Sequence, residues 1–222
     1  MIRLDVEGAL WIVTIDRADK ANSLTTAMLG DLAGIASRAA SEGVRALILT
    51  GNGRVFSAGA DLDQARAGLA THPVWEQLSG ALAALPCLTI AALNGTLAGG
   101  AMGMALACDL RIAVPDAKFF YPVMKLGFLP QPSDPPRMTA LIGPARSKMI
   151  LMAGQKISAQ EALTFGLIDR IVPPETLMDA ARALVADVMT ASDDHVAGIK
   201  RMISAKIPTA RQEGGHGSDH GR

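Results

Sequence analysis

The chain has 222 residues, of which 50% are apolar, and its 21 basic side chains balance 21 acidic ones. This length fits one domain, with or without a helical appendage, and the apolar content excludes a wholly disordered chain. The balanced charge gives no indication of a nucleic-acid partner or of binding to an anionic membrane surface.

Strands and helices are predicted to alternate over the first 114 residues. Runs of apolar residues bounded by turn residues favour strands, and apolar residues three and four apart favour helices. Thr25 or Thr26 is placed to cap the first helix. The predicted strands are 10–15, 46–50, 87–93 and 110–114, and the predicted helices are 25–42, 78–85 and 99–108. Residues 63–76 are expected to form a loop or a loose helix.

The elements that follow are shorter. Ser158 and Glu161 match a capping box, in which each side chain satisfies a backbone donor at the start of a helix. The remaining predictions are strands at 119–121 and 168–172, a stiff proline-rich break at 131–136, and helices at 146–152, 158–165, 174–189 and 194–205.

This alternation predicts an α/β fold of right-handed βαβ units with a mainly parallel sheet, followed by a helical C-terminal region. We expect a core over residues 1–173, a helical region over 174–207 and a disordered, glycine-rich tail over 208–222. No internal repeat or linker divides the chain into two domains.

The segment from Gln77 to Cys108 contains no charged residue and is long enough to span a membrane. Pro86 and the pair Asn94-Gly95 interrupt it, so we expect a helix end, a buried strand and a second helix, with no membrane span. Cys87 and Cys108 lie in apolar runs and are expected to be buried and reduced, which favours a cytoplasmic protein. The alternation of residues 1–16 predicts a strand rather than a targeting leader.

Two glycine turns, each after an apolar run, point to chemistry. One is Asn94-Gly95-Thr96-Leu97-Ala98-Gly99-Gly100, which opens an apolar helix, and the other is Phe56-Ser57-Ala58-Gly59-Ala60-Asp61-Leu62. Glycines leave backbone N–H groups accessible, and a helix N-terminus has unpaired donors. Two such turns in one domain can direct two amides at one oxygen, which is the geometry of an oxyanion hole.

At these residues the chain resembles the crotonase (enoyl-CoA hydratase/isomerase) superfamily, and the resemblance covers roughly residues 1–205. The matching segments are Arg17 to Leu24, Thr50 to Leu62, Ala91 to Ala113, Ala117-Lys118-Phe119, Gly127 with Pro130, and Gly154 to Ile171. The resemblance implies a spiral of stacked ββα turns, acyl-coenzyme A thioesters as ligands, and assembly as trimers or dimers of trimers. It implies no bound cofactor beyond the coenzyme A of the substrate, and no metal.

The resemblance also implies roles for individual residues. The N–H groups of Ala58 and Gly100 would hold the thioester oxygen. The acyl and pantetheine groups would pass along the first turn, and the adenine end of coenzyme A would lie near the loop before it. The residues implied in these contacts are Gly59, Ala60, Asp61 and Leu62 in the turn, and Lys20, Ala21 and Asn22 in the loop.

The chain departs from the family pattern at its acids. A hydratase of this family uses two glutamates, and their positions are occupied here by Gly103 and Val123, while Gln131 occupies a third position where some relatives place an aspartate. None of these three side chains transfers protons. Efficient hydration of a 2-enoyl thioester is therefore not expected, because each general acid or base contributes about 10²–10⁴ in rate.

Several other polar residues are candidates to replace these acids. Asp134 is either a turn or N-cap carboxylate, the interpretation we favour, or a relocated acid or base. Tyr121 is either a packed tyrosine or a hydrogen-bond donor to substrate, and His72 is expected to be solvated on a loop. Asp61 is expected to cap the next helix. Ser57 lacks the spacing of a nucleophile elbow.

His216 and His220 have helical spacing, but their glycine-rich surroundings favour a solvated tail over a metal site. Two functions remain open. One is an enzyme that stabilises a thioester enolate and moves protons by a non-standard route; the other is a non-catalytic acyl-CoA binder. Relatives continue for about fifty more residues, so the shortened C-terminal region is expected to leave the ligand site more open.

Overall fold

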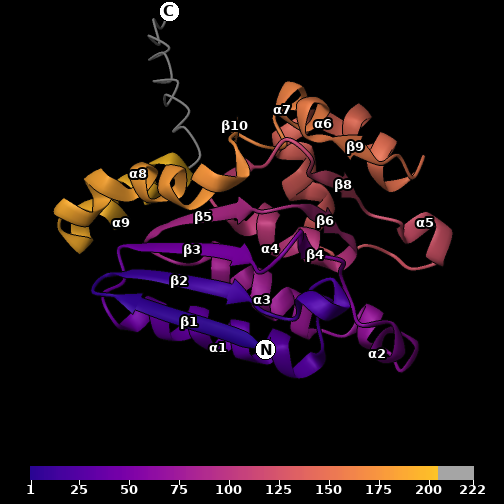
Figure 1. Cartoon of the computed structure of the whole chain (residues 1–222), viewed down its shortest axis with the longest axis horizontal. Helices are drawn as coiled ribbons and strands as arrows, with labels where there is room; N and C mark the ends of the chain where they lie inside the picture. Colours follow the sequence, from indigo (N-terminus) through magenta and orange to yellow (C-terminus); the bar gives the residue numbers. More distant parts are fainter. Residues whose placement is uncertain (205–222) are drawn as a thin grey trace, which may run out of the picture.

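The computed structural model describes residues 1–204 and contains two β-sheets flanked by helices (Figure 1). The six-stranded sheet has the order β1-β2-β3-β5-β7-β10, and the four-stranded sheet has the order β4-β6-β8-β9. The larger sheet comprises β1 (Ile2–Glu7), β2 (Leu10–Ile15), β3 (Ala46–Gly51), β5 (Leu88–Leu93), β7 (Leu110–Ala113) and β10 (Arg170–Ile171). The smaller comprises β4 (Val55–Ser57), β6 (Thr96–Ala98), β8 (Lys118–Phe120) and β9 (Ile157–Ser158).

The larger sheet is parallel from β2 to β10, and only β1 runs antiparallel, paired with β2 in a hairpin. Its central strands β3 and β5 are apolar almost throughout, and nearly all of their residues are buried. This composition suits a parallel strand that is covered on both faces.

The chain visits the two sheets in turn. After β3, β5 and β7 in the larger sheet, it passes directly to β4, β6 and β8 in the smaller one. Helices then return it to the larger sheet, at β5 and β7 directly and at β10 after the short strand β9 of the smaller sheet. Each circuit is one ββα turn of a spiral, so corresponding points of successive circuits lie beside one another.

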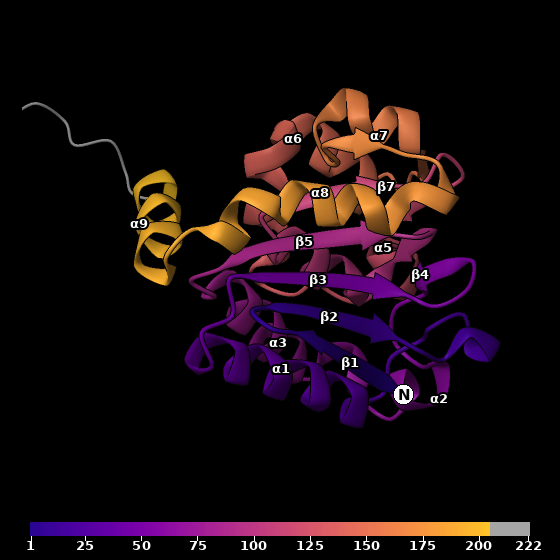
Figure 2. The ribbon, with the colours of Figure 1, turned by 60° about the vertical axis from the view of Figure 1, so that its left-hand side comes forward.

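Helices cover both faces of the larger sheet (Figure 2). On one face α1 and α3 pack together, and their apolar side chains meet those of β2 and β3; α8 lies across the other face, over β5 and β3. The α-helices are α1 (Thr26–Ser41), α2 (Leu62–Arg66), α3 (Val74–Ala83), α4 (Met102–Ala107), α5 (Val123–Leu126), α6 (Asp134–Leu151), α7 (Ala159–Phe165), α8 (Leu177–Thr190) and α9 (Asp193–Ser204). Short 3₁₀ turns occupy Ala18–Lys20, Leu69–Thr71, Gly99–Ala101 and Pro174–Thr176.

Most of the predicted elements are confirmed, including the mainly parallel α/β architecture. Thr25 caps α1 by accepting a hydrogen bond from the amide of Met28, and Ser158 and Glu161 form the predicted capping box. The three-residue strands β4 and β6 were not predicted, because neither is long enough to show a period. The histidines His216 and His220 and the predicted tail lie outside the described residues.

The predicted break at 131–136 is wrong in its second half. Helix α6 begins at Asp134, and Pro135 and Pro136 lie in its first turn. Proline is tolerated there because the first amides of a helix have no intrahelical acceptor. Gly143, with φ of 77°, kinks this helix, which explains why only its second half, near 146–152, was predicted.

The turn that joins β5 to β6 requires a glycine at position 95. A Cβ atom there would lie far inside contact distance of the carbonyl oxygen of Arg54, the residue just before β4. We predict that Gly95→Ala lowers the free energy of unfolding by roughly 3 kcal/mol, because backbone on both sides would have to move.

The matched control is Gly34→Ala, on the exposed face of α1, where a Cβ meets nothing within 4 Å. This change should stabilise the chain by about 1 kcal/mol through helix propensity. Chemical denaturation measures both changes, and equal midpoints for the two variants would contradict the prediction.

Candidate active site

Three adjacent strands of the smaller sheet position the segments that form the candidate site. β4, β6 and β8 are parallel neighbours, so their carboxyl ends lie at one edge of the sheet. The chain leaving β4 contains Ala58 to Ala60, the chain leaving β6 contains Gly99 and Gly100, and the residue after β8 is Tyr121. The fold therefore brings together three segments that are separated by twenty to forty residues in the sequence.

The two glycine turns are in direct contact. An ideal Cβ built on Gly59 would lie 2.9 Å from the carbonyl oxygen of Ala98 and 3.5 Å from the amide nitrogen of Gly100. Gly59 has φ of 92° and Gly99 has φ of 59°, and residues that have a side chain rarely adopt such positive values of φ. Both glycines are thus required by conformation, and Gly59 also by the close approach of the two turns.

The amides at this contact differ in availability. The N–H of Ala58 donates to the carbonyl oxygen of Ala21 at 3.0 Å, so it is already engaged. The N–H of Ala60 has no acceptor within residues 1–204. Gly100 is the second residue of a 3₁₀ turn, so its amide has no acceptor inside that turn. From the sequence, Ala60 was expected only to line the acyl path; its unpaired amide is evident only from the hydrogen bonds of the structure.

A cavity of about 230 Å³ opens against these amides. Its lining is almost entirely apolar, and its only two residues with polar side-chain groups are Tyr121 and Trp75, whose indole N–H donates to the carbonyl oxygen of Leu69. The lining residues are Ala58, Ala60, Leu62, Ala65, Ala70, Trp75, Gly99, Gly100, Tyr121, Pro122, Val123, Leu126, Phe128 and Leu129. Trp75 was missed by the sequence analysis, where its only signal was a position one turn before the predicted helix at 78–85.

The loop before α1 holds the first turn in place. Asn22 is fully buried, and its side chain accepts from the amide of Arg17 and donates to the carbonyl oxygens of Asn52 and Val55. This asparagine is therefore a structural residue whose side chain is fully used. Ala21 and Asn22 both have left-handed backbone conformations, and Lys20 is exposed beside them.

Asp61 caps α2, as predicted, by accepting from the amides of Asp63 and Gln64. Arg17 also donates to its carboxylate at 2.8 Å, and this hydrogen bond lowers the pKa of Asp61. The carboxylate is therefore engaged in structure and is poorly suited to proton transfer.

No acid stands at the two positions where the family resemblance places glutamates. Gly103 lies in α4, within the buried core, and Val123 is a buried cavity-lining residue at the start of α5. Gln131 donates to the carbonyl oxygen of Ala70, tying together two loops beside the cavity.

Asp134 is neither a turn residue at the surface nor an N-cap, so the interpretation that we favoured from the sequence is wrong. It is the first residue of α6 and is completely buried. The hydroxyl of Tyr121 donates to its Oδ2 at 3.0 Å, whereas Oδ1 has no hydrogen-bond partner. Burial raises the pKa of Asp134 to about 7 and, together with the neighbouring carboxylate, raises that of Tyr121 far above its usual range.

The remaining candidates lie away from this chemistry. His72 is exposed, and its Nδ1 accepts from the amide of Val74. Ser57 is fully buried, and its hydroxyl donates to the carbonyl oxygen of Asn22 and accepts from the amide of Gly59. Ser57 therefore fixes the shape of the glycine turn and is not exposed as a nucleophile.

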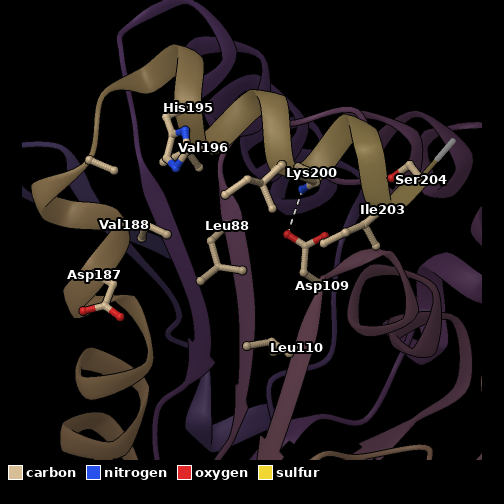
Figure 3. Close-up of a pocket in the computed structure, with 12 residues that line it drawn as sticks. Leu88, Asp109, Leu110, Asp187, Val188, His195, Val196, Lys200, Ile203 and Ser204 are labelled. Carbon is tan, nitrogen blue, oxygen red and sulfur yellow. Dashed lines mark hydrogen bonds and ion pairs between the residues drawn. The ribbon is translucent and has the colours of Figure 1, made fainter.

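A larger cavity, of about 540 Å³, lies elsewhere, under α9 at the start of β5 and β7 (Figure 3). Its lining is mostly apolar, and its central polar feature is the ion pair between Lys200 and Asp109, 2.7 Å apart. Asp109 also accepts from the amide and hydroxyl of Thr89, so its carboxylate is used in structure. Its size alone therefore does not make this cavity the candidate site.

Two other predictions concern the cysteines and a membrane span. Cys87 and Cys108 are buried and free, as expected, and burial raises their pKa values to about 11 and about 12. Among the helices of residues 1–204, none has both the length and the apolar content to cross a membrane.

Comparisons with known proteins identify the family to which this chain belongs. The family model described as enoyl-CoA hydratase/isomerase matches residues 5–219. A Rhodobacter capsulatus protein named "Probable enoyl-CoA hydratase" is 33% identical over 211 residues, covering 93% of this chain and 82% of its own length. The short-chain-enoyl-CoA hydratase of Clostridium acetobutylicum is 32% identical over 198 residues, covering 84% and 74%.

Comparison with a solved structure supports the same family through the fold. The crystal structure of an enoyl-CoA hydratase from Bacillus anthracis aligns with a TM-score of 0.84 and 32% identity, covering 91% of this chain and 82% of that one. The match to the family model over most of the sequence, supported by these relatives, shows that this chain belongs to the enoyl-CoA hydratase/isomerase family of the crotonase superfamily.

Proposed function

We propose that this protein binds an acyl-coenzyme A thioester and stabilises its enolate. The thioester oxygen would lie between the amides of Ala60 and Gly100, with the acyl group in the 230 Å³ cavity. The observation that carries this proposal is the contact of two glycine turns at the cavity, each offering an amide without a protein acceptor. Relatives named as enoyl-CoA hydratases support the class of ligand.

The physical reason is that an enolate concentrates negative charge on one oxygen. Amides held in the backbone are already oriented towards that oxygen, so they need no reorganisation when the charge develops. Removing one such donor typically costs about 10²–10³ in rate. We assign this donor to Ala60 rather than Ala58, because the amide of Ala58 is bonded to Ala21.

The rest of the coenzyme would extend out of the cavity along the first turn. Leu62 lines the cavity and is 73% exposed, so it can cover the pantetheine arm. The exposed Lys20 beside Ala21 supplies a positive charge for the phosphates at the adenine end. Asn22 would support this contact only indirectly, since its side chain is committed to the backbone.

Hydration of a 2-enoyl thioester is not the reaction that this site favours. Two acids that would hold and activate water are replaced by Gly103 and Val123. The same absence favours a second candidate function, a non-catalytic acyl-CoA binder in the cytoplasm. The test is to incubate the protein with crotonyl-CoA and 3-enoyl-CoAs and to look for products by mass spectrometry. Saturable binding without any product would establish the binder and exclude the enzyme.

The enolate site is tested with Gly59→Ala. A Cβ here would collide with the backbone of Ala98 and separate the two turns. Acetoacetyl-CoA reports the result directly, because its enolate has its own ultraviolet absorption. We predict that the wild type lowers the pH at which this enolate forms, and that Gly59→Ala loses about a hundredfold in affinity for it.

Gly8→Ala is the matched control. Gly8 also has positive φ, at 63°, but a Cβ there meets nothing within 4 Å, and it lies in the distant hairpin turn between β1 and β2. It should bind acetoacetyl-CoA as the wild type does. Equal binding by Gly59→Ala would overturn the proposed geometry, and absence of saturable binding by the wild type would overturn the coenzyme A proposal.

We also propose that the protein assembles as a homotrimer or a dimer of trimers. Large apolar side chains are exposed around α5, beside the cavity, and these would be buried by a neighbouring copy. They are Met124, Leu126, Phe128 and Leu129.

Light scattering should therefore give at least three times the mass of the 23.1-kDa chain. Leu129 is 85% exposed, and Leu129→Lys is expected to shift the mass towards that of a single chain. Met152→Lys, at an exposed site at the far end of α6, serves as the control. A wild type with the mass of one chain at micromolar concentration would contradict the assembly.

A further inference from the structure

A buried carboxylate lies directly behind the candidate site. Asp134 has no exposed surface, and one of its oxygens has no hydrogen-bond partner among the described residues. Burying a charged group without compensation is costly, so such a group calls for a role beyond stability. Its position and its single partner indicate what that role is.

Asp134 occupies space that a side chain at position 103 would need. A Cβ on Gly103 would lie 2.6 Å from Oδ1 of Asp134 and 3.2 Å from its Cγ. The absence of a side chain on α4 is therefore what admits the carboxylate of α6. A carboxylate is present in this part of the site after all, and it enters from a different helix.

Tyr121 connects this carboxylate to the cavity. The tyrosine lines the cavity, and its hydroxyl donates to Oδ2 of Asp134 at 3.0 Å. Asp134 itself does not line the cavity. Any proton that passes between Asp134 and a bound acyl group must therefore pass through the Tyr121 hydroxyl.

We propose that Tyr121 and Asp134 form a proton relay that moves one proton between two carbons of an unsaturated acyl thioester, converting a 3-enoyl-CoA into a 2-enoyl-CoA. This inference rests on the proposed function, because it needs the thioester oxygen to be held by the two amides. Tyr121 is the catalytic residue. Asp134, which touches no substrate, is a positioning residue that also holds the transferred proton.

The first step breaks the C2–H bond. The C2 proton passes to the Tyr121 oxygen while the tyrosine proton passes to Oδ2 of Asp134. The electron pair of the C2–H bond moves to the thioester oxygen, where the amides of Ala60 and Gly100 stabilise the dienolate.

The second step returns a proton at C4. Asp134 gives its proton back to the Tyr121 oxygen, and Tyr121 gives its proton to C4. The dienolate electrons re-form the thioester carbonyl and a C2–C3 double bond. No water, oxidant or second acid is consumed, which suits a site with one proton-transfer unit.

The burial of the relay makes a further consequence testable. Because Asp134 is sealed from solvent and Tyr121 is only 4% exposed, the proton held on the relay exchanges slowly while substrate fills the cavity. The proton removed from C2 is therefore the one returned to C4.

Two groups influence the charge of Asp134 from nearby: Glu76, which raises its pKa, and Arg137, which lowers it.

The experiment follows the conversion of 3-enoyl-CoAs to conjugated 2-enoyl-CoAs by absorbance, with deuterium at C4 measured by mass spectrometry in D₂O. The wild type should isomerise the substrate and retain protium at C4 in most of the product. Tyr121→Phe and Asp134→Asn should each lose about 10²–10⁴ in kcat while still binding substrate. Asp116→Asn, at an exposed site, is the control and should match the wild type.

The outcomes separate the two levels of the proposal. Binding without isomerisation by the wild type, normal isomerisation by Tyr121→Phe, or complete deuteration at C4 would each overturn the relay and leave enolate binding intact. Failure of the wild type to bind any acyl-CoA would overturn the proposed function itself. The pH profile of kcat adds a readout that a structural role would not change. The wild-type rate should fall below about pH 7, where Asp134 becomes protonated, and this limb should be absent in Asp134→Asn.

Asp134 should also make stability depend on pH. Its pKa is about 7 in the folded chain against an ordinary value of 3.8, so the folded chain binds more protons than the unfolded chain between these values. The stability of the wild type should therefore fall as pH rises through this window. Thermal unfolding should show Asp134→Asn gaining on the wild type from about pH 4 to pH 7. A difference in Tm that is constant with pH would show that Asp134 does not titrate in the folded protein.

Discussion

The site depends on the parallel pairing of three short strands. β4, β6 and β8 contain only three residues each, yet their alignment fixes where three chain segments leave the smaller sheet. One segment ends in Ala60, the next in Gly100 and the third in Tyr121. The larger sheet holds these strands in place, since β3, β5 and β7 are buried and each leads directly into one of them. Backbone pairing of these strands therefore sets the position of each segment, and the residues of the segment determine which amide or side chain it presents to the cavity.

The contact between Gly59 and the Gly99-Gly100 turn shows why small residues are required there. A methyl group added at Gly59 would clash with backbone atoms, which cannot move aside as a flexible side chain can. Hydrogen bonds from Ala58 to Ala21 and from Ser57 to Asn22 tie the first turn to the preceding loop. The amide of Gly59 donates to the Ser57 hydroxyl, so within residues 1–204 the first amide after Ala58 that has no acceptor is that of Ala60. The rigidity of the turn and the availability of one donor thus have the same cause.

Much of this was predictable from the sequence, and the failures have physical reasons. The two glycine turns and the caps at Thr25 and Ser158 depend on local signals, and they are confirmed as structural elements. The donor was placed at Ala58 because a sequence cannot show that Ala21, thirty-seven residues earlier, accepts from it. Asp134 was interpreted as a turn residue because its neighbours are prolines, although prolines also begin helices. Its burial depends on the packing of α6 against α4, which no local pattern contains.

Gly103 and Asp134 are best understood together. An alanine at position 103 would displace the carboxylate, and without Asp134 the glycine would leave an unfilled space in the core. The proposed oxyanion hole would consist of backbone amides, so replacing a side chain that lines the cavity would leave both donors in place. The proposed proton-transfer groups are side chains, so they could be lost from one helix and supplied from another. Under the proposed function, such a fold would keep its means of stabilising an enolate, while the identity and position of its acids would determine which reaction the enolate undergoes.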